Sequence, residues 1–88
     1  MNEDEYSFDG IDVQLNGYWY VVSGRIFFKY YIENGSAFLN DCTDVEIAEI
    51  EKMEQDGTEV EHTKEDVEKV SDEIRYHFDD YMEIQIED

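Results

Sequence analysis

The sequence predicts an α+β fold: an antiparallel meander of three to five strands, with one C-terminal amphipathic helix packed across a face. Residues 11–15 alternate apolar and polar side chains, as a half-buried strand does, and residues 18–32 are rich in aromatic and β-branched residues between turn signals. Residues 63–81 instead repeat apolar side chains at helical spacing. The apolar fraction of 41% is close to that of ordinary globular domains, so the acidic composition does not predict a disordered chain. We expect residues 1–88 to form a single domain in which residues 1–6 fray.

The first half of the chain predicts a hairpin followed by a third strand. Residues 11–15 alternate apolar and polar side chains, and Asn16-Gly17 behind them is the strongest short signal for a type I′ hairpin turn. Residues 18–22 are expected to form the returning strand. Ser23-Gly24 is then expected to turn the chain into a strand over residues 25–32, and residues 33–43 are expected to form a loop.

Residues 44–53 fit either a strand or a helix, and we favour the strand. Val45 and Ile47 alternate with acids, whereas Ala48 and its charged neighbours would also suit a helix. Asp56-Gly57 lies where a hairpin turn would return residues 58–61 to this strand. The position of this turn favours the strand over the helix.

The last element is predicted to be a helix of about five turns. Thr63 and Asp66 have the spacing of a capping box, with Asp in place of the usual Glu or Gln. The apolar positions recur at steps of three and four residues: Val67, Val70, Ile74, Phe78 and Tyr81. Acids at the end of this helix oppose its macrodipole. Residues that lower the stability of the fold are found more often at functional surfaces.

The formal net charge of −19 is the strongest indication of function. Small folded domains usually keep a net charge of roughly 2–8, because self-repulsion opposes compaction. Most of the acids lie in residues 44–88, so that half of the chain concentrates the negative potential. The charge predicts a partner with a strongly basic surface, such as one built to hold nucleic acid.

Carboxylates on the predicted helix are candidates for contacting that partner. Acids three or four positions apart on a helix lie about 5–6 Å from one another, and such a row could occupy lysine and arginine sites that normally bind phosphates. The candidate acids are Glu65, Glu68, Asp72, Glu73, Asp79, Asp80 and Glu83. The alternative is an ordinary solvated helix face with Lys64, Lys69 and Arg75 interspersed for solubility.

Trp19, Phe27 and Tyr31 are candidates for an aromatic contact. Their phase places them on the sheet face opposite that of Tyr20 and Phe28. One helix covers one side of a small sheet, so the second aromatic face needs a dimer mate, a target protein or the loop at residues 36–43. Such a patch would supply binding energy at an interface. The alternative is core packing from both sides of the sheet.

Several segments resemble those of small, acidic, uncharacterised bacteriophage proteins. They are the aromatic hairpin at residues 17–20, residues 44–47, the turn and strand at residues 56–60 and the acidic helix that begins at Thr63. In size and charge, though not by motif, the chain also resembles phage DNA-mimic inhibitors, including anti-restriction and anti-CRISPR proteins. That resemblance implies a stoichiometric inhibitor that blocks a basic nucleic-acid-binding surface of a bacterial defence protein, such as a CRISPR effector or a restriction enzyme.

Two other functions remain open from the sequence. An immunity protein or antitoxin could use the same charge to cap a basic nuclease. A structural or adaptor phage subunit could instead use the aromatic sheet face as a permanent interface, and a homodimer would let a chain this small bury more surface. We expect no direct binding of nucleic acid, because the negative charge repels it.

The residue inventory contains no catalytic motif, so we do not expect an enzyme. His62 and His77 lie far apart without a zinc-type partner, no EF-hand spacing occurs, and no cofactor is expected. Cys42 lies beside acids that raise a thiol pKa, and a single cysteine fits a reducing cytosol. The N-terminal residues lack signal-peptide features and no apolar run approaches about 20 residues, so we expect a cytoplasmic protein without membrane contact, in the host cell if phage-encoded.

Overall fold

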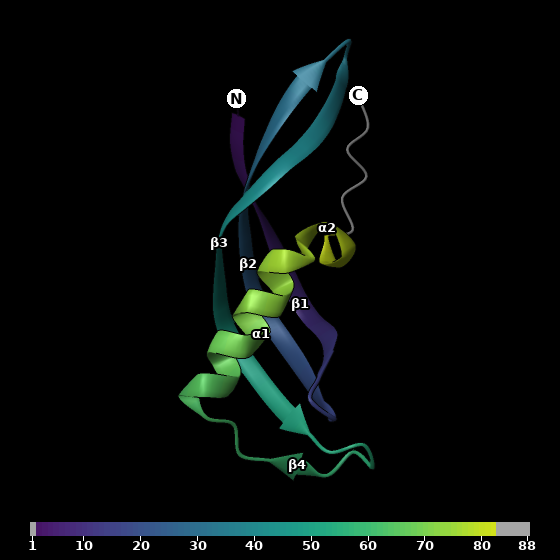
Figure 1. Cartoon of the computed structure of the whole chain (residues 1–88), viewed down its shortest axis with the longest axis vertical. Helices are drawn as coiled ribbons and strands as arrows, with labels where there is room; N and C mark the ends of the chain where they lie inside the picture. Colours follow the sequence, from purple (N-terminus) through teal and green to yellow (C-terminus); the bar gives the residue numbers. More distant parts are fainter. Residues whose placement is uncertain (1, 83–88) are drawn as a thin grey trace.

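The computed structural model describes residues 2–82, which form a four-stranded antiparallel sheet followed by two helices (Figure 1). The sheet is a meander in the order β1-β2-β3-β4. The elements are β1 (Asn2–Leu15), β2 (Tyr18–Glu33), β3 (Ser36–Met53), β4 (Glu59–Val60), α1 (Lys64–Tyr76) and α2 (Phe78–Tyr81). The predicted α+β meander with a C-terminal helix is confirmed.

Two Asn-Gly turns connect the three long strands. Asn16 and Gly17 have φ values of 53° and 82°, and Asn34 and Gly35 have 54° and 80°, so both turns have the positive φ that type I′ hairpins require. The first turn was predicted. The loop predicted at residues 33–43 is wrong, because Asn34-Gly35 is a two-residue turn that folds the chain straight back and residues 36–43 begin β3.

The turn predicted at Ser23-Gly24 is also wrong, because β2 runs through both residues without interruption. Gly24 is needed there for a different reason: a Cβ at this position would collide with the carbonyl oxygen of Glu46 on β3. The glycine permits a close approach between two backbones in the middle of the sheet.

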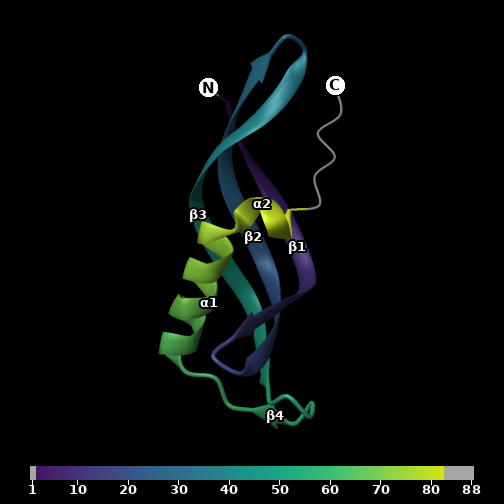
Figure 2. The ribbon, with the colours of Figure 1, turned by 45° about the vertical axis from the view of Figure 1, so that its right-hand side comes forward.

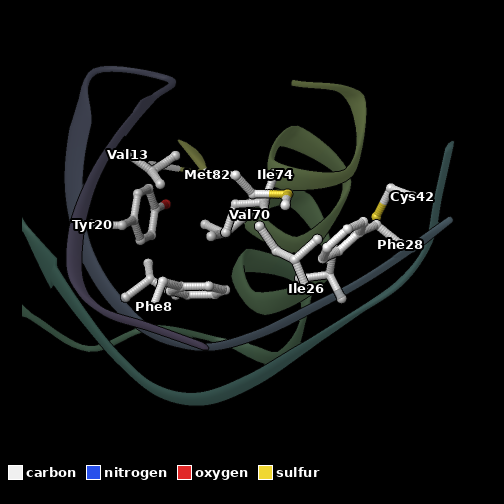
Figure 3. Close-up of a cluster of buried hydrophobic side chains, with 11 residues drawn as sticks. Phe8, Val13, Tyr20, Ile26, Phe28, Cys42, Val70, Ile74 and Met82 are labelled. Atoms are coloured by element: carbon white, nitrogen blue, oxygen red, sulfur yellow. The ribbon is translucent and has the colours of Figure 1, made fainter. Parts of the chain in front are cut away.

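Ser23 instead holds a β-bulge in β1. Asp9 and Gly10 together oppose Ser23, which leaves one extra residue in β1, and Gly10 has φ of 66°. The Ser23 hydroxyl donates to Oδ1 of Asp9 and accepts from the amide of Gly10, both at 3.0 Å. β3 has comparable bulges against β2 at Asn40, Thr43 and Ala48. Bulges bend a strand and increase its twist, which fits the curved sheet seen in Figure 3.

Asn2–Tyr6, for which the sequence predicted fraying, are paired with Ile26–Tyr30 of β2 in the structure. The long partner strand offers these residues backbone partners along their whole length. At the other end of the sheet, the strand favoured over residues 44–53 and the turn at Asp56-Gly57 are both confirmed. β4 returns beside Lys52 and Met53, and the amide of Gly57 donates to the carbonyl of Glu54 at 2.9 Å.

The predicted single helix is two helices. The capping box at Thr63 and Asp66 is present, but α1 ends at Tyr76 and α2 begins after His77. The break changes the electrostatic position of Asp79 and Asp80, which now lie in the first turn of α2, where the macrodipole favours acids. Within residues 2–82, neither helix has the length and apolar composition needed to cross a bilayer.

Both helices pack on one face of the sheet, which we call the core face (Figures 2 and 3). Val70 and Ile74 of α1 are fully buried against it, and Phe78 and Tyr81 of α2 extend the contact together with Met82, which follows α2. The buried cluster from the strands consists of Phe8, Val13, Tyr20, Val22, Ile26, Phe28, Cys42 and Val45. Burying such side chains contributes about 1.5–3 kcal/mol each.

Candidate partner-binding surface

The opposite side of the sheet, which we call the outer face, is covered by no element among residues 2–82. Directly opposed residues in antiparallel strands point to the same side, so the register assigns each side chain to a face. Along β2 the core face takes Tyr20, Val22, Ile26 and Phe28. The outer face takes the alternate residues: Trp19, Val21, Ser23, Arg25, Phe27, Lys29 and Tyr31.

A row of acids follows β3 along the outer face. All acids of this row are exposed: Asp41, Asp44, Glu46, Glu49 and Glu51. In that order, they oppose Lys29, Phe27, Arg25, Ser23 and Val21 of β2. Their sequence spacing alternates between three and two residues because Thr43 and Ala48 are bulged. The bulges keep all five carboxylates on one face, where regular alternation would have sent some to the core.

A second, shorter row follows β1 on the other side of β2. Glu3, Glu5 and Asp12 oppose Lys29, Phe27 and Val21, and all three acids are exposed. Neighbouring strands lie about 4.8 Å apart, so the two rows are about 10 Å apart, and same-face neighbours along a strand are about 7 Å apart. Two acidic rows therefore flank a central strip of mixed aromatic and basic residues.

Basic residues neutralise part of these rows. Arg25 lies 3.4 Å from Glu5 and 4.0 Å from Glu46, so it joins the rows across β2. Lys29 lies 3.8 Å from Glu3, and Arg75 of α1 reaches Asp44 at 3.1 Å. Such half-exposed pairs contribute at most about 1 kcal/mol each.

Four acids of the two rows make no ion pair within the described part of the chain: Asp12, Asp41, Glu49 and Glu51. They are free to meet a cationic partner.

The aromatic candidates lie on this same outer face, as predicted from their phase. Trp19 is half-buried, and its Nε1 donates to Oε1 of Gln55 at 3.3 Å. Phe27 lies between Glu5 and Asp44 in the register. Tyr31 stacks on Phe38 with ring centroids 5.4 Å apart. They are spread along the length of β2, so they form a strip and not one compact patch.

The helix acids are more dispersed than the sequence predicted. Glu65 pairs with Lys69 at 3.2 Å, and His77 lies 3.8 Å from both Glu73 and Asp80. The exposed helix acids without an ion pair, counted over residues 2–82, are Glu68, Asp72 and Asp79. The break at His77 separates Asp79 from the other two, and Glu83 lies outside the described residues. Within residues 2–82, the predicted helix acids therefore do not lie on one continuous helix.

One further helix acid is structural. The side chain of Asp66 is 14% exposed and accepts hydrogen bonds from the Thr63 amide at 2.8 Å, the Tyr20 hydroxyl at 3.0 Å and Nζ of Lys52 at 3.1 Å. The Thr63 amide, followed by Lys52 and Tyr20, holds the pKa of Asp66 well below its usual range. Burial and the neighbouring Asp66 raise the pKa of Tyr20 to about 12. This network fixes the start of α1 to the sheet.

Cys42 and the potential metal ligands provide no second candidate site within residues 2–82. Cys42 is buried, and burial raises the pKa of its thiol, with smaller opposing effects from Arg75 and from the Asp44 backbone. No cluster of His, Cys, Asp and Glu suited to a metal ion occurs within residues 2–82. The hollows on the described surface are shallow and open; one of them, between β1 and α2, is lined by Tyr6, Asp9, Asp12 and Tyr81.

Sequence reasoning missed the two sheet rows and emphasised the helix. The signal was present in β3 as acids at alternating steps of three and two residues, but this pattern indicates one face only once Thr43 and Ala48 are known to be bulged. No protein-family model, curated protein or solved structure matches this chain.

Proposed function

We propose that the protein is a stoichiometric acidic inhibitor that mimics nucleic acid and blocks a basic nucleic-acid-binding surface on a bacterial defence protein. The observation that supports this most is the pair of acidic rows on the uncovered outer face of the sheet. Carboxylates fixed on strands keep their spacing, whereas acids on a loop would not. A rigid array of this kind can occupy several lysine and arginine sites at once.

The dimensions of the two rows are comparable with those of a duplex. Their separation of about 10 Å lies between the widths of the minor and major grooves of B-DNA, about 6 and 12 Å. Along the β3 row the charges are about 7 Å apart, roughly half the axial charge density of one DNA strand, whereas on β1 Asp12 lies about 20 Å beyond Glu5. The mimic would therefore engage a subset of the phosphate sites of its target. The total charge of −19 adds long-range attraction that accelerates encounter with a basic surface.

The central strip would supply apolar contacts, which charge alone does not provide. Phe27 and Val21 lie between the rows, where a bound partner would remove them from water. Aromatic side chains at the centre of an interface commonly provide much of its binding energy. Acids would then guide the encounter, while the apolar contacts of Phe27 and Val21 would slow dissociation.

We place this activity in the cytoplasm of a bacterial host, where defence nucleases act. A CRISPR effector or a restriction enzyme is the kind of target that fits. The protein itself would bind neither nucleic acid nor membrane, since both are anionic. It would need no cofactor, because the proposed inhibition is competitive binding and not chemistry.

The experiment is affinity capture from nuclease-treated bacterial lysate with the tagged full-length chain, followed by elution with DNA at constant ionic strength. We expect a nucleic-acid-binding protein to be retained, displaced by DNA, and released by moderate salt. Recovery of a dedicated toxin nuclease would favour the immunity-protein alternative. Retention that DNA does not compete and salt does not weaken would contradict nucleic-acid mimicry.

A further inference from the structure

The β2–β3 hairpin extends past the rest of the sheet. The last described pair between β1 and β2 is Asn2 with Tyr30, whereas β2 and β3 continue through Tyr31–Phe38, Ile32–Ala37 and Glu33–Ser36. Figure 1 shows this hairpin projecting at the end of the molecule opposite β4. We call residues 31–38 the tip.

The tip exposes apolar side chains that a two-stranded ribbon cannot bury. Large exposed apolar residues are few among residues 2–82, and three of the four belong to the tip: Tyr31, Ile32 and Phe38, at 38%, 61% and 45% exposure. Tyr31 and Phe38 stack on one side of the ribbon, and Ile32 lies on the other side opposite Ala37. Both sides of the tip are therefore apolar. An exposed ribbon of this composition is a site of association.

The tip is also almost free of charge in a chain of net charge −19. Residues 30–40 contain one carboxylate, Glu33, and no lysine or arginine. A basic target recognised through the acidic rows gains no attraction from this end. Two copies of the chain, however, can approach each other here without opposing their acidic rows.

We propose that the tip is a self-association site, through which two copies of the chain pack their hairpins together. The molecule is 48 Å long, so contact at the tips leaves most charges of the two copies much farther apart than the Debye length of about 8 Å. Among residues 2–82, Ser36–Phe38 of β3 pair with β2 alone, so their other edge leaves backbone groups available for pairing between copies. This proposal does not depend on the proposed function.

The interface is small, so the dimer is weak and depends on concentration. Interfaces below about 1,200 Å² are characteristic of transient association. Salt should strengthen it, because screening reduces the repulsion between like-charged copies. A basic partner bound at the outer face would show the opposite salt dependence.

The test is sedimentation velocity of the full chain from low to high micromolar concentration, at two ionic strengths. We expect a monomer–dimer equilibrium that shifts toward dimer with salt. Ile32→Ser should weaken association by about 10-fold or more, because each copy loses a buried side chain at the interface. Tyr76→Ser is the matched control, since Tyr76 is 82% exposed on α1 and lies away from the tip.

Three results would overturn the proposal. They are a monomer at every concentration, association that I32S leaves unchanged, and association that Y76S abolishes. Circular dichroism of both variants establishes that they remain folded, and Phe38→Ser provides an independent second variant of the tip. Binding of a captured target by I32S at wild-type strength would separate this site from the outer face.

Discussion

At the scale of single residues, Asp66 has a clear structural role. It is the N3 residue of α1, and it also binds Lys52 and Tyr20 from the sheet. Lys52 in turn lies 4.2 Å from the centroid of the Tyr18 ring. One carboxylate therefore satisfies the helix start and joins the two layers of the fold.

Asp66→Asn should lower the free energy of unfolding by about 2 kcal/mol, because the amide cannot accept the same set of charge-assisted bonds. The pKa of Asp66 is lowered in the folded state, so its contribution is complete above the unfolded pKa of about 4 and is lost as the pH falls below it. Urea unfolding between pH 7 and pH 3 measures both effects. Asp72→Asn, on an exposed acid of the same helix, should leave stability unchanged or slightly increase it.

Gly24 offers a second prediction at this scale. Gly24→Ala should lower the free energy of unfolding by about 3 kcal/mol, since the added Cβ meets a backbone carbonyl that cannot rotate away. Gly17→Ala is the control: its Cβ meets nothing nearby, so only the positive φ of 82° is strained, at a cost of about 1 kcal/mol. Equal stability losses for the two variants in urea unfolding would contradict the role assigned to Gly24.

At the scale of elements, local signals predicted the fold class but not the strand lengths. Asn16-Gly17 predicts its turn correctly, whereas Asn34-Gly35, which has the same chemistry and the same positive φ values, lies inside the segment predicted to be a loop. Ser23-Gly24 looked like a turn because serine and glycine punctuate many chains. Its actual roles, holding a bulge and permitting close backbone contact, depend on strands that are distant in sequence.

The candidate surface was likewise predicted where local sequence signals suffice and missed where it depends on the pairing of distant strands. The phase of Trp19, Phe27 and Tyr31 was readable because β2 is regular on that side, and the outer face was thereby predicted. The acids of β3 were not assigned, because the bulges at Thr43 and Ala48 break the two-residue period that sequence reasoning relies on. The helix ended early at His77 with no proline or glycine to mark the break.

At the scale of the whole molecule, charge and apolar surface are separated along an elongated body. The acidic rows occupy the outer face of the sheet, the core face is closed by two helices, and the tip, with Glu33 as its one carboxylate, projects at one end. The helices carry acids too, but three of the predicted ones have a basic or histidine neighbour within 4 Å. We therefore propose that a partner binds at the sheet and not at the helices.

The most direct test compares two triple variants with the same change in net charge. The sheet variant carries Asp41→Asn, Glu49→Gln and Glu51→Gln; the helix variant carries Glu68→Gln, Asp72→Asn and Asp79→Asn. All six acids are exposed and make no ion pair among the described residues.

Each variant competes with DNA for the captured target over a range of salt concentrations. The account predicts that the sheet variant loses at least about 10-fold in affinity, with a shallower salt dependence, while the helix variant binds nearly as the native chain does. Equal losses in both variants, or a loss confined to the helix variant, would contradict it.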